Sequence, residues 1–230
     1  MRTSGRRNTL CWHESLQGQI GFPDPSDLVD QDNHSGWARM VVHLDLEIPD
    51  VDTFWRTRPP VGRPNDRATI DQLHRITVLG GSVSSHALGG CCPVTGGFVS
   101  LLDIRPDTRH QVMYYNVEFA DTKGRPRTLG GYKAVFGPAA DLWVDTTALL
   151  CHVYEGAGSH TGELDDRIIG TGVLKISLAD LVRLTLSFRP AEGGVVDGVR
   201  DVTVFYAGFA RRLWQVYRPG GSGRVPAPVC

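Results

Sequence analysis

The 230-residue chain has no excess of one charge: 24 lysines and arginines stand against 25 aspartates and glutamates, a formal net charge of −1. Non-specific nucleic-acid binding requires a strongly basic surface, so the composition argues against a nucleic-acid partner. No window approaches about 18 uninterrupted apolar residues, and the basic N-terminus is followed by no apolar segment typical of a secretory signal. The sequence therefore predicts a cytoplasmic protein without a membrane partner.

Cysteine is sparse and odd in number, with Cys11, Cys91, Cys92, Cys151 and Cys230. The adjacent Cys91 and Cys92 lack the two-residue spacing with which a zinc pair places both thiolates on one ion. Scattered cysteines of this kind are typical of reduced thiols in a cytosolic protein. Cys151 lies in an apolar run and is expected to pack as a small hydrophobic side chain.

The common catalytic signatures are also missing. The glycines at 156 and 158 lack the third glycine of a dinucleotide-binding loop, and residues 80–84 lack the final glycine of a hydrolase nucleophile elbow. The chain contains neither a Walker A loop nor a His-Glu-x-x-His zinc motif. A metal site built from His110, His152 and a carboxylate stays open as an alternative, but we expect no metal and no cofactor.

Glycine and proline are abundant, with 27 and 14 residues, which indicates many turns between short elements. An apolar fraction of 41% over this length suffices for a core without metals or disulfides. Polar and apolar residues alternate from Trp37 to Ile48, the period of a half-buried strand. Alternation and turn signals predict strands over residues 10–22, 37–48, 68–79 (ended by Gly80 and Gly81), 97–104, 110–120, 127–136, 149–155 and 167–176.

The last quarter of the chain changes to helical spacing. Ser177 is a candidate N-cap for a helix, and Val195–Tyr217 has the pattern of a longer amphipathic helix. We therefore predict a mainly β fold, an antiparallel eight-stranded (or near) closed β-barrel of calycin-like type with C-terminal α-helices packed on it. Residues 1–218 form this single domain, and residues 219–230 are expected to be a disordered tail. A barrel of this size encloses either its own side chains or one small ligand.

Polar residues on the central strands are the candidates for a catalytic site inside the barrel. Lys133 lies on an apolar strand face, where a lysine either extends to the rim or pairs with a buried carboxylate. Glu118, across the predicted hairpin, is the candidate partner. The predicted catalytic residues are Tyr114, Lys133, Glu118 and His152, because polar groups that line an apolar cavity orient a ligand. For each of them the alternative is a place on the solvated outer face.

A second set of residues is predicted to contact the substrate: Trp143, Tyr154, Met40, Leu102 and Phe136. Trp143 follows a Gly-Pro pair in a cluster of aspartates and threonines. It is either part of a capped turn, with side chains bonded to free backbone amides, or a lid over the barrel mouth. We favour the capped turn.

Several blocks resemble a known barrel, in order: Gly-Arg-Pro at 124–126, Thr-Leu-Gly-Gly-Tyr-Lys at 128–133, Asp-Leu-Trp at 141–143, Asp-Thr-Thr at 145–147 and Gly-Thr-Gly-Val-Leu-Lys-Ile at 170–176. With Leu213, Trp214 and Tyr217, they are similar to the barrel domain that accompanies bacterial sterol-oxidase-like flavoproteins of the glucose-methanol-choline family. The resemblance covers about residues 37–217 and implies a fold, because the flavin-binding and catalytic parts of those oxidases are absent. Free-standing barrels of similar type accompany polyether and tetronate polyketide pathways, where they act as cyclases without cofactors.

Three functions remain open at this point. The first is a cofactor-independent cyclase that folds a hydrophobic linear polyketide-type substrate in the barrel and promotes ring closure, for example by a Diels–Alder-type (4+2) cycloaddition in natural-product biosynthesis. Pre-organisation alone can contribute up to ~7–11 kcal/mol to such a step. The second is a sterol- or lipid-binding barrel that serves an oxidoreductase without catalysis, and the third is a filled barrel with a structural role. The expected partner is a small hydrophobic ligand or substrate, and a homodimer stays open.

Overall fold

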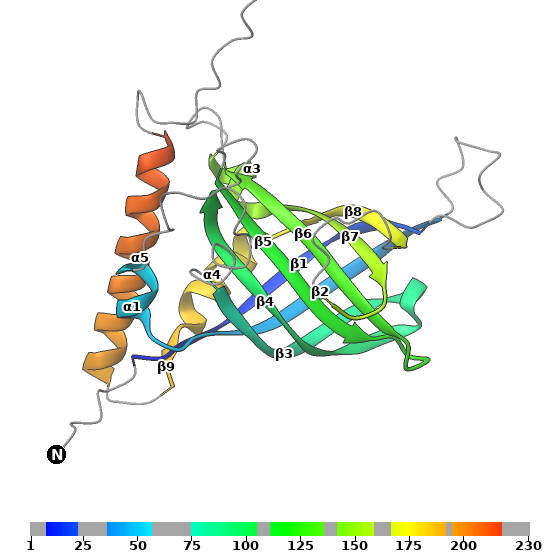
Figure 1. Cartoon of the computed structure of the whole chain (residues 1–230), viewed down its shortest axis with the longest axis horizontal. Helices are drawn as coiled ribbons and strands as arrows, with labels where there is room; N and C mark the ends of the chain where they lie inside the picture. Colours follow the sequence, from blue (N-terminus) through cyan, green and yellow to red (C-terminus); the bar gives the residue numbers. More distant parts are fainter. Residues whose placement is uncertain are drawn as a thin grey trace, which may run out of the picture.

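The chain folds into a closed barrel in the computed structural model, which describes residues 8–22, 36–56, 75–104, 111–135, 142–158, 167–191 and 195–217 (Figure 1). The eight barrel strands are β1 (Leu10–Gly21), β2 (Trp37–Ile48), β3 (Arg75–Ser85), β4 (Gly90–Ile104), β5 (Gln111–Ala120), β6 (Pro126–Val135), β7 (Ala148–Glu155) and β8 (Ile168–Lys175). Each pairs antiparallel with the next along the chain, and β1 also pairs with β8, so the sheet closes on itself. The predicted mainly β fold with an eight-stranded antiparallel barrel is confirmed.

Three helices lie together at one end of the barrel, on the left in Figure 1. They are α1 (Val51–Arg56), α4 (Leu178–Ser187) and α5 (Val195–Tyr217). We call this the helical end, where β1 begins, and the opposite end the turn end. The remaining short elements are the 3-10 helix η3 (His86–Leu88) at the turn end, α3 (Leu142–Thr147) before β7, and β9 (Arg189–Pro190), which pairs with the start of β1. The predicted C-terminal helices are therefore present.

The start of α4 has the predicted cap. The Ser177 hydroxyl accepts a hydrogen bond from the Asp180 backbone N–H at 3.1 Å, which satisfies one of the free donors of the first turn. The same hydroxyl donates to the Asp180 carboxylate at 2.5 Å. The Ser177 hydroxyl therefore both accepts and donates in the first turn of α4, which begins two residues after β8 ends at Lys175.

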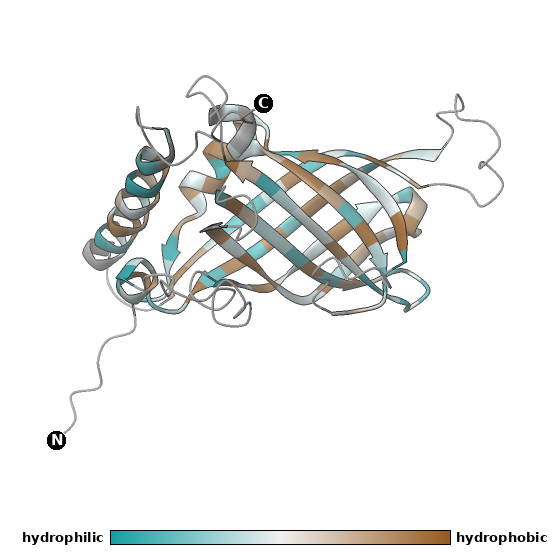
Figure 2. Ribbon diagram, turned by 45° about the horizontal axis from the view of Figure 1, so that its top comes forward, coloured by the Kyte–Doolittle hydropathy of each residue, from teal (hydrophilic) through white to brown (hydrophobic). Residues whose placement is uncertain are grey.

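Alternation along the strands sends one set of side chains into the barrel. In Figure 2 apolar and polar residues follow one another along the strands in alternating bands. In β2 the buried set is the one that the sequence pattern predicts: Ala38, Met40, Val42, Leu44, Leu46 and Ile48. Successive side chains of a strand point to opposite faces, so one phase of the alternation fills the interior and the other faces outward.

An aromatic cluster covers the interior at the helical end. Trp12 of β1 stacks on Phe188, with ring centroids 5.0 Å apart, and lies 5.5 Å from the ring of Phe205 on α5. A salt bridge of 2.8 Å between Arg200 and Asp52 ties α5 to α1. The apolar stripe predicted for α5 therefore packs across this end of the barrel.

Two strand boundaries predicted from the sequence are wrong. β3 does not end at Gly80 and Gly81 but continues through them to Ser85, and β4 begins at Gly90 instead of residue 97. Gly81 has φ +136°, and a Cβ there would lie 1.9 Å from the backbone oxygen of His43. Gly81 and Gly80 pair with Leu44 and Asp45, and the next pair is Val78 with Leu46, so Leu79 is the extra residue of a bulge and the strand bends without stopping.

Some predictions fall outside the described residues and have no structural outcome. They include residues 68–74 of the predicted third strand, Phe136, His110 and the predicted tail at 219–230.

Candidate functional site

Three polar side chains meet inside the barrel: Glu14 on β1, Tyr115 on β5 and Lys133 on β6. The Tyr115 hydroxyl donates a hydrogen bond of 2.8 Å to Glu14 Oε1, and Lys133 Nζ lies 3.0 Å from the same oxygen. The side chains of Lys133 and Glu14 are only 2% and 6% exposed. We call these residues the interior triad.

Strand alternation places each member of the interior triad. Trp12 and Leu16, two residues either side of Glu14, are both buried, so Glu14 occupies an inward position of β1. Met113 and Val117 stand in the same relation to Tyr115. β6 and β1 are separated by β7 and β8 in the sheet, so the pair joins distant strands through long side chains.

The electrostatics of the interior triad favour a protonated tyrosine. Burial first, then the charge of Glu14 and the hydrogen bond to it, raise the pKa of Tyr115 well above its usual value. Lys133 Nζ also lies 4.8 Å from the centre of the Tyr115 ring, a cation–π contact. One carboxylate and one ammonium cancel in charge, which is the condition under which charged groups are tolerated in an apolar interior.

Hydrogen-bonding capacity remains at the interior triad. An ammonium has three N–H donors, and a carboxylate can accept on both oxygens. In the described part of the chain, Lys133 has one hydrogen-bond acceptor, Glu14 Oε1, and Glu14 Oε2 receives no hydrogen bond. The arrangement can therefore donate to a ligand oxygen and accept from a ligand donor while its internal bonds persist.

The structure corrects the partner predicted for Lys133. Of the places left open for Lys133, the structure shows the pairing with a buried carboxylate, but the partner is Glu14 and not Glu118. Glu118 pairs in register with Thr128, near the turn end, whereas Lys133 stands opposite Met113 near the helical end. The sequence contained a signal for Glu14, a lone acidic residue between Trp12 and Leu16, but the first strand was the least regular of the predicted set.

Three other predicted residues share a face away from the interior. Tyr114, the neighbour of the buried Tyr115, is partly exposed and lies 6.1 Å from Phe98, ring to ring. His152 Nδ1 is 2.9 Å from Thr171 Oγ1, and the His152 ring contacts Tyr154 at 5.9 Å. Tyr114, His152 and Tyr154 are therefore on the outer surface, and the expectation that they line the interior is wrong. The apolar residues Met113 and Val117, which alternate with Tyr115, indicate the inward face of β5 more reliably than the polar residues do.

The remaining predicted contact residues divide between interior and surface. Met40 is fully buried in β2, and Leu102 is 3% exposed. Leu102 has φ +57°, at a register shift of β4, an uncommon backbone state for a residue with a side chain. Trp143 is 47% exposed on α3, and its carbonyl accepts a hydrogen bond from the Thr147 hydroxyl at 2.6 Å. Trp143 therefore lies in a short helix, where the threonine hydroxyls bond to its carbonyl and not to free backbone amides as predicted.

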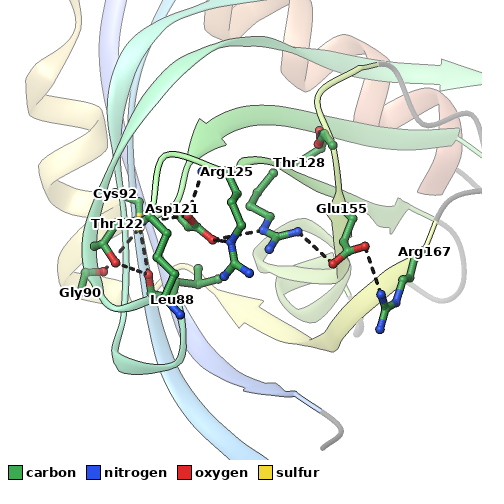
Figure 3. A network of polar contacts seen from close by, with 12 residues as sticks. Leu88, Gly90, Cys92, Asp121, Thr122, Arg125, Thr128, Glu155 and Arg167 are labelled. Carbon is green, nitrogen blue, oxygen red and sulfur yellow. Dashed lines mark hydrogen bonds and ion pairs between the residues drawn. The ribbon is translucent and has the colours of Figure 1, made fainter. Parts of the chain in front are cut away.

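A network of charged side chains lies at the turn end (Figure 3). Asp121 accepts a 2.8 Å bond from Arg125 Nε and lies 3.4 Å from Arg127 Nε. Glu155 is 3.3 Å from Arg127 and 3.4 Å from Arg167. Arg127 and Asp121 are almost fully buried, so the ion pairs tie the β5–β6 turn to the far ends of β7 and β8.

Metal ligation and membrane spanning have no support among the described residues. No group of three or more His, Cys, Asp or Glu side chains there could hold a metal ion. No helix there is long and apolar enough to cross a membrane. The described cysteines are free, and Cys151 is buried as expected. Comparison with models of known protein families and with curated protein sequences finds no match to the chain.

Proposed function

We propose that the protein is a cofactor-independent cyclase that binds a linear, apolar, polyketide-type substrate in the barrel and promotes its ring closure. The observation that carries this proposal is the interior triad, because it places spare hydrogen-bond donors in an apolar interior. Such a site binds an apolar chain by contact and orients it by one carbonyl group. The resemblance of the sequence to free-standing polyketide cyclase barrels supports the same function.

The chemistry required of the protein is small. In a (4+2) closure a conjugated diene and an alkene of one molecule form two carbon–carbon single bonds, and no atom enters or leaves. The barrel holds the two ends of the chain in the reactive conformation, which contributes up to ~7–11 kcal/mol. Lys133 donates a hydrogen bond to a carbonyl conjugated with the alkene and stabilises the charge that develops on its oxygen.

The two ends of the barrel differ in a way that favours access from one of them. The turn end has the charged network of Asp121, Arg127 and Glu155, and the helical end has the aromatic rings of Trp12 and Phe205. Desolvating charged groups is costly, so an apolar substrate enters beside the aromatic rings. This route requires α5 to move away from β1 during binding.

The test uses purified protein without added metal or flavin. A linear polyene with a terminal conjugated ketone is incubated with the wild type, with Lys133→Met and with Lys175→Met. Lys175 is an exposed lysine of β8 and serves as the matched control. We expect the wild type and Lys175→Met to form a ring-closed isomer of identical mass, and Lys133→Met to lose at least tenfold in rate. Saturable binding with unchanged substrate would overturn the cyclase and favour the sterol- or lipid-binding alternative.

A further inference from the structure

Lysine is rare in this chain and one copy is inside the barrel. The sequence has three lysines, Lys123, Lys133 and Lys175, among 24 basic residues. Lys123 and Lys175 are exposed, whereas Lys133 is 2% exposed. Arginine forms stronger, bidentate pairs with carboxylates and is the commoner basic residue here by far. The buried position nevertheless has the basic side chain that can lose its proton and act as a nucleophile.

The contacts of Lys133 supply what an amine nucleophile needs. Glu14 Oε1 is 3.0 Å from Nζ, within direct proton-transfer distance. Tyr115 donates to the same oxygen at 2.8 Å and holds the carboxylate in place. Glu14 is therefore placed to accept the ammonium proton when Lys133 reacts.

We propose that Lys133 forms a Schiff base with the carbonyl group of an apolar aldehyde or ketone bound in the barrel, with Glu14 as the proton acceptor. This inference rests on the proposed ligand site but not on ring closure. It assigns the substrate class, an apolar molecule with an unhindered carbonyl, and it makes Lys133 a covalent catalyst in place of a hydrogen-bond donor.

The step balances without another reactant. The Lys133 ammonium gives one proton to Glu14, and the free amine adds to the carbonyl carbon while the carbonyl π bond breaks. The alkoxide takes the proton of the new nitrogen centre to give a neutral carbinolamine. Glu14 returns its proton to the hydroxyl, water leaves, and a protonated C=N bond remains. The positive iminium then pairs with the Glu14 carboxylate, so the net charge of the interior is unchanged.

Iminium formation would act directly on the ring closure proposed above. A full positive charge on the nitrogen withdraws electrons from a conjugated alkene more strongly than a hydrogen bond to its carbonyl does. The Glu14 carboxylate, held by Tyr115, stabilises that charge in a site from which water is excluded. Hydrolysis by the reverse steps releases the product and restores the interior triad.

The experiment traps the Schiff base with a simple probe. The full chain is incubated with cinnamaldehyde and cyanoborohydride, and the labelled lysines are located by peptide mass spectrometry. We expect Lys133 to be labelled at least tenfold faster than the exposed Lys123 and Lys175. Lys133→Arg keeps a buried cation opposite Glu14 and should abolish this fast phase. Glu14→Gln removes the proton acceptor and should slow Lys133 labelling at least tenfold, with the two exposed lysines unaffected.

A thermal-shift measurement with cinnamaldehyde alone separates the two proposals. Stabilisation of the wild type with no fast labelling of Lys133 would overturn the Schiff base and leave the ligand site standing. The absence of both stabilisation and labelling would overturn the Schiff base together with the ligand site on which it rests. Equal labelling rates for the three lysines would also overturn the inference, because Lys133 would then have no special reactivity.

Discussion

Lys133 Nζ and Glu14 Oε1 are 3.0 Å apart, and neither side chain is more than 6% exposed. An ion pair in this position is not explained by stability alone, because the desolvation of both charges can exceed their mutual attraction. Apolar residues of similar size often replace such pairs at no loss. The pair also makes the stability of the barrel sensitive to the loss of either partner.

Removing one charge of the pair should be worse than removing both. We expect Lys133→Met and Glu14→Gln each to lower the free energy of unfolding by about 3–5 kcal/mol, since each leaves a buried charge alone. The double variant should lose less than either single variant, because it leaves no unpaired charge in the interior. Urea unfolding at neutral pH measures all four proteins. Additive losses would show that the two charges are not coupled.

Tyr115 should resist ionisation in the folded protein. Burial and Glu14 raise its pKa, so the folded state keeps its proton at a pH where the unfolded chain, with a tyrosine pKa of about 10, loses it. The stabilisation is complete below pH about 10 and is lost as the pH rises toward the folded-state pKa. In Tyr115→Phe, the alkaline fall in unfolding free energy should be shallower by up to ~1.4 kcal/mol per pH unit.

The titration of Cys151 does not affect the comparison of the wild type with Tyr115→Phe at alkaline pH. Burial raises its pKa to about 12, and its own alkaline contribution is present in both proteins. The tyrosinate absorbance of the folded wild type should also show one of the six tyrosines titrating only on unfolding. If the titration curve of the folded wild type differed from that of Tyr115→Phe by one tyrosine with an ordinary pKa, Tyr115 would not be buried and hydrogen-bonded as described.

Two aromatic side chains of α5, one buried and one exposed, allow a matched comparison. Phe205 is 6% exposed against Trp12 and Phe188, and Trp214 is 69% exposed. We expect Phe205→Ala to cost about 3–5 kcal/mol of unfolding free energy, as for other buried aromatic rings. Trp214→Ala should change it by no more than about 0.5 kcal/mol. Chemical denaturation checks both, and similar losses would mean that α5 does not pack on β1 through Phe205.

Asp121 should link the turn end to acid stability. Burial raises the pKa of its carboxyl, but the backbone N–H and guanidinium of Arg125 and the N–H of Lys123 outweigh this and hold it below its usual value. This stabilisation is present above the unfolded pKa of about 3.9 and is lost as the pH falls through the folded-state pKa. Asp121→Asn should therefore cost about 1–3 kcal/mol at pH 7, and progressively less in acid.

The exposed pair of Asp45 and His13 provides the control for Asp121. Asp45→Asn should change the unfolding free energy at pH 7 by less than about 1 kcal/mol, since solvent screens surface pairs. Denaturant unfolding between pH 3 and pH 7 compares the two variants. A pH-independent loss in Asp121→Asn would show that the carboxylate charge has no part in the network.

Local patterns in the sequence were sufficient to predict the architecture. Alternation in β2 and the helical stripe of α5 are properties of neighbouring residues, and both survive in the folded chain. The end of the third strand was predicted wrongly at Gly80 and Gly81, because a glycine can either end a strand or let it bend. Only the pairing with β2, which runs through both glycines and shifts register at Leu79, shows that the strand bends here and continues.

The sequence by itself was enough to predict a barrel, to place Lys133 on an apolar strand face, and to show that ordinary catalytic motifs are lacking. Tertiary structure alone decided which carboxylate meets that lysine. Glu14 and Lys133 are far apart in the sequence and come from strands separated by two others, so no local spacing relates them. Closure of the sheet sets which inward side chains face each other across the barrel. The interior triad is therefore a consequence of the fold, built from residues that the sequence presents separately.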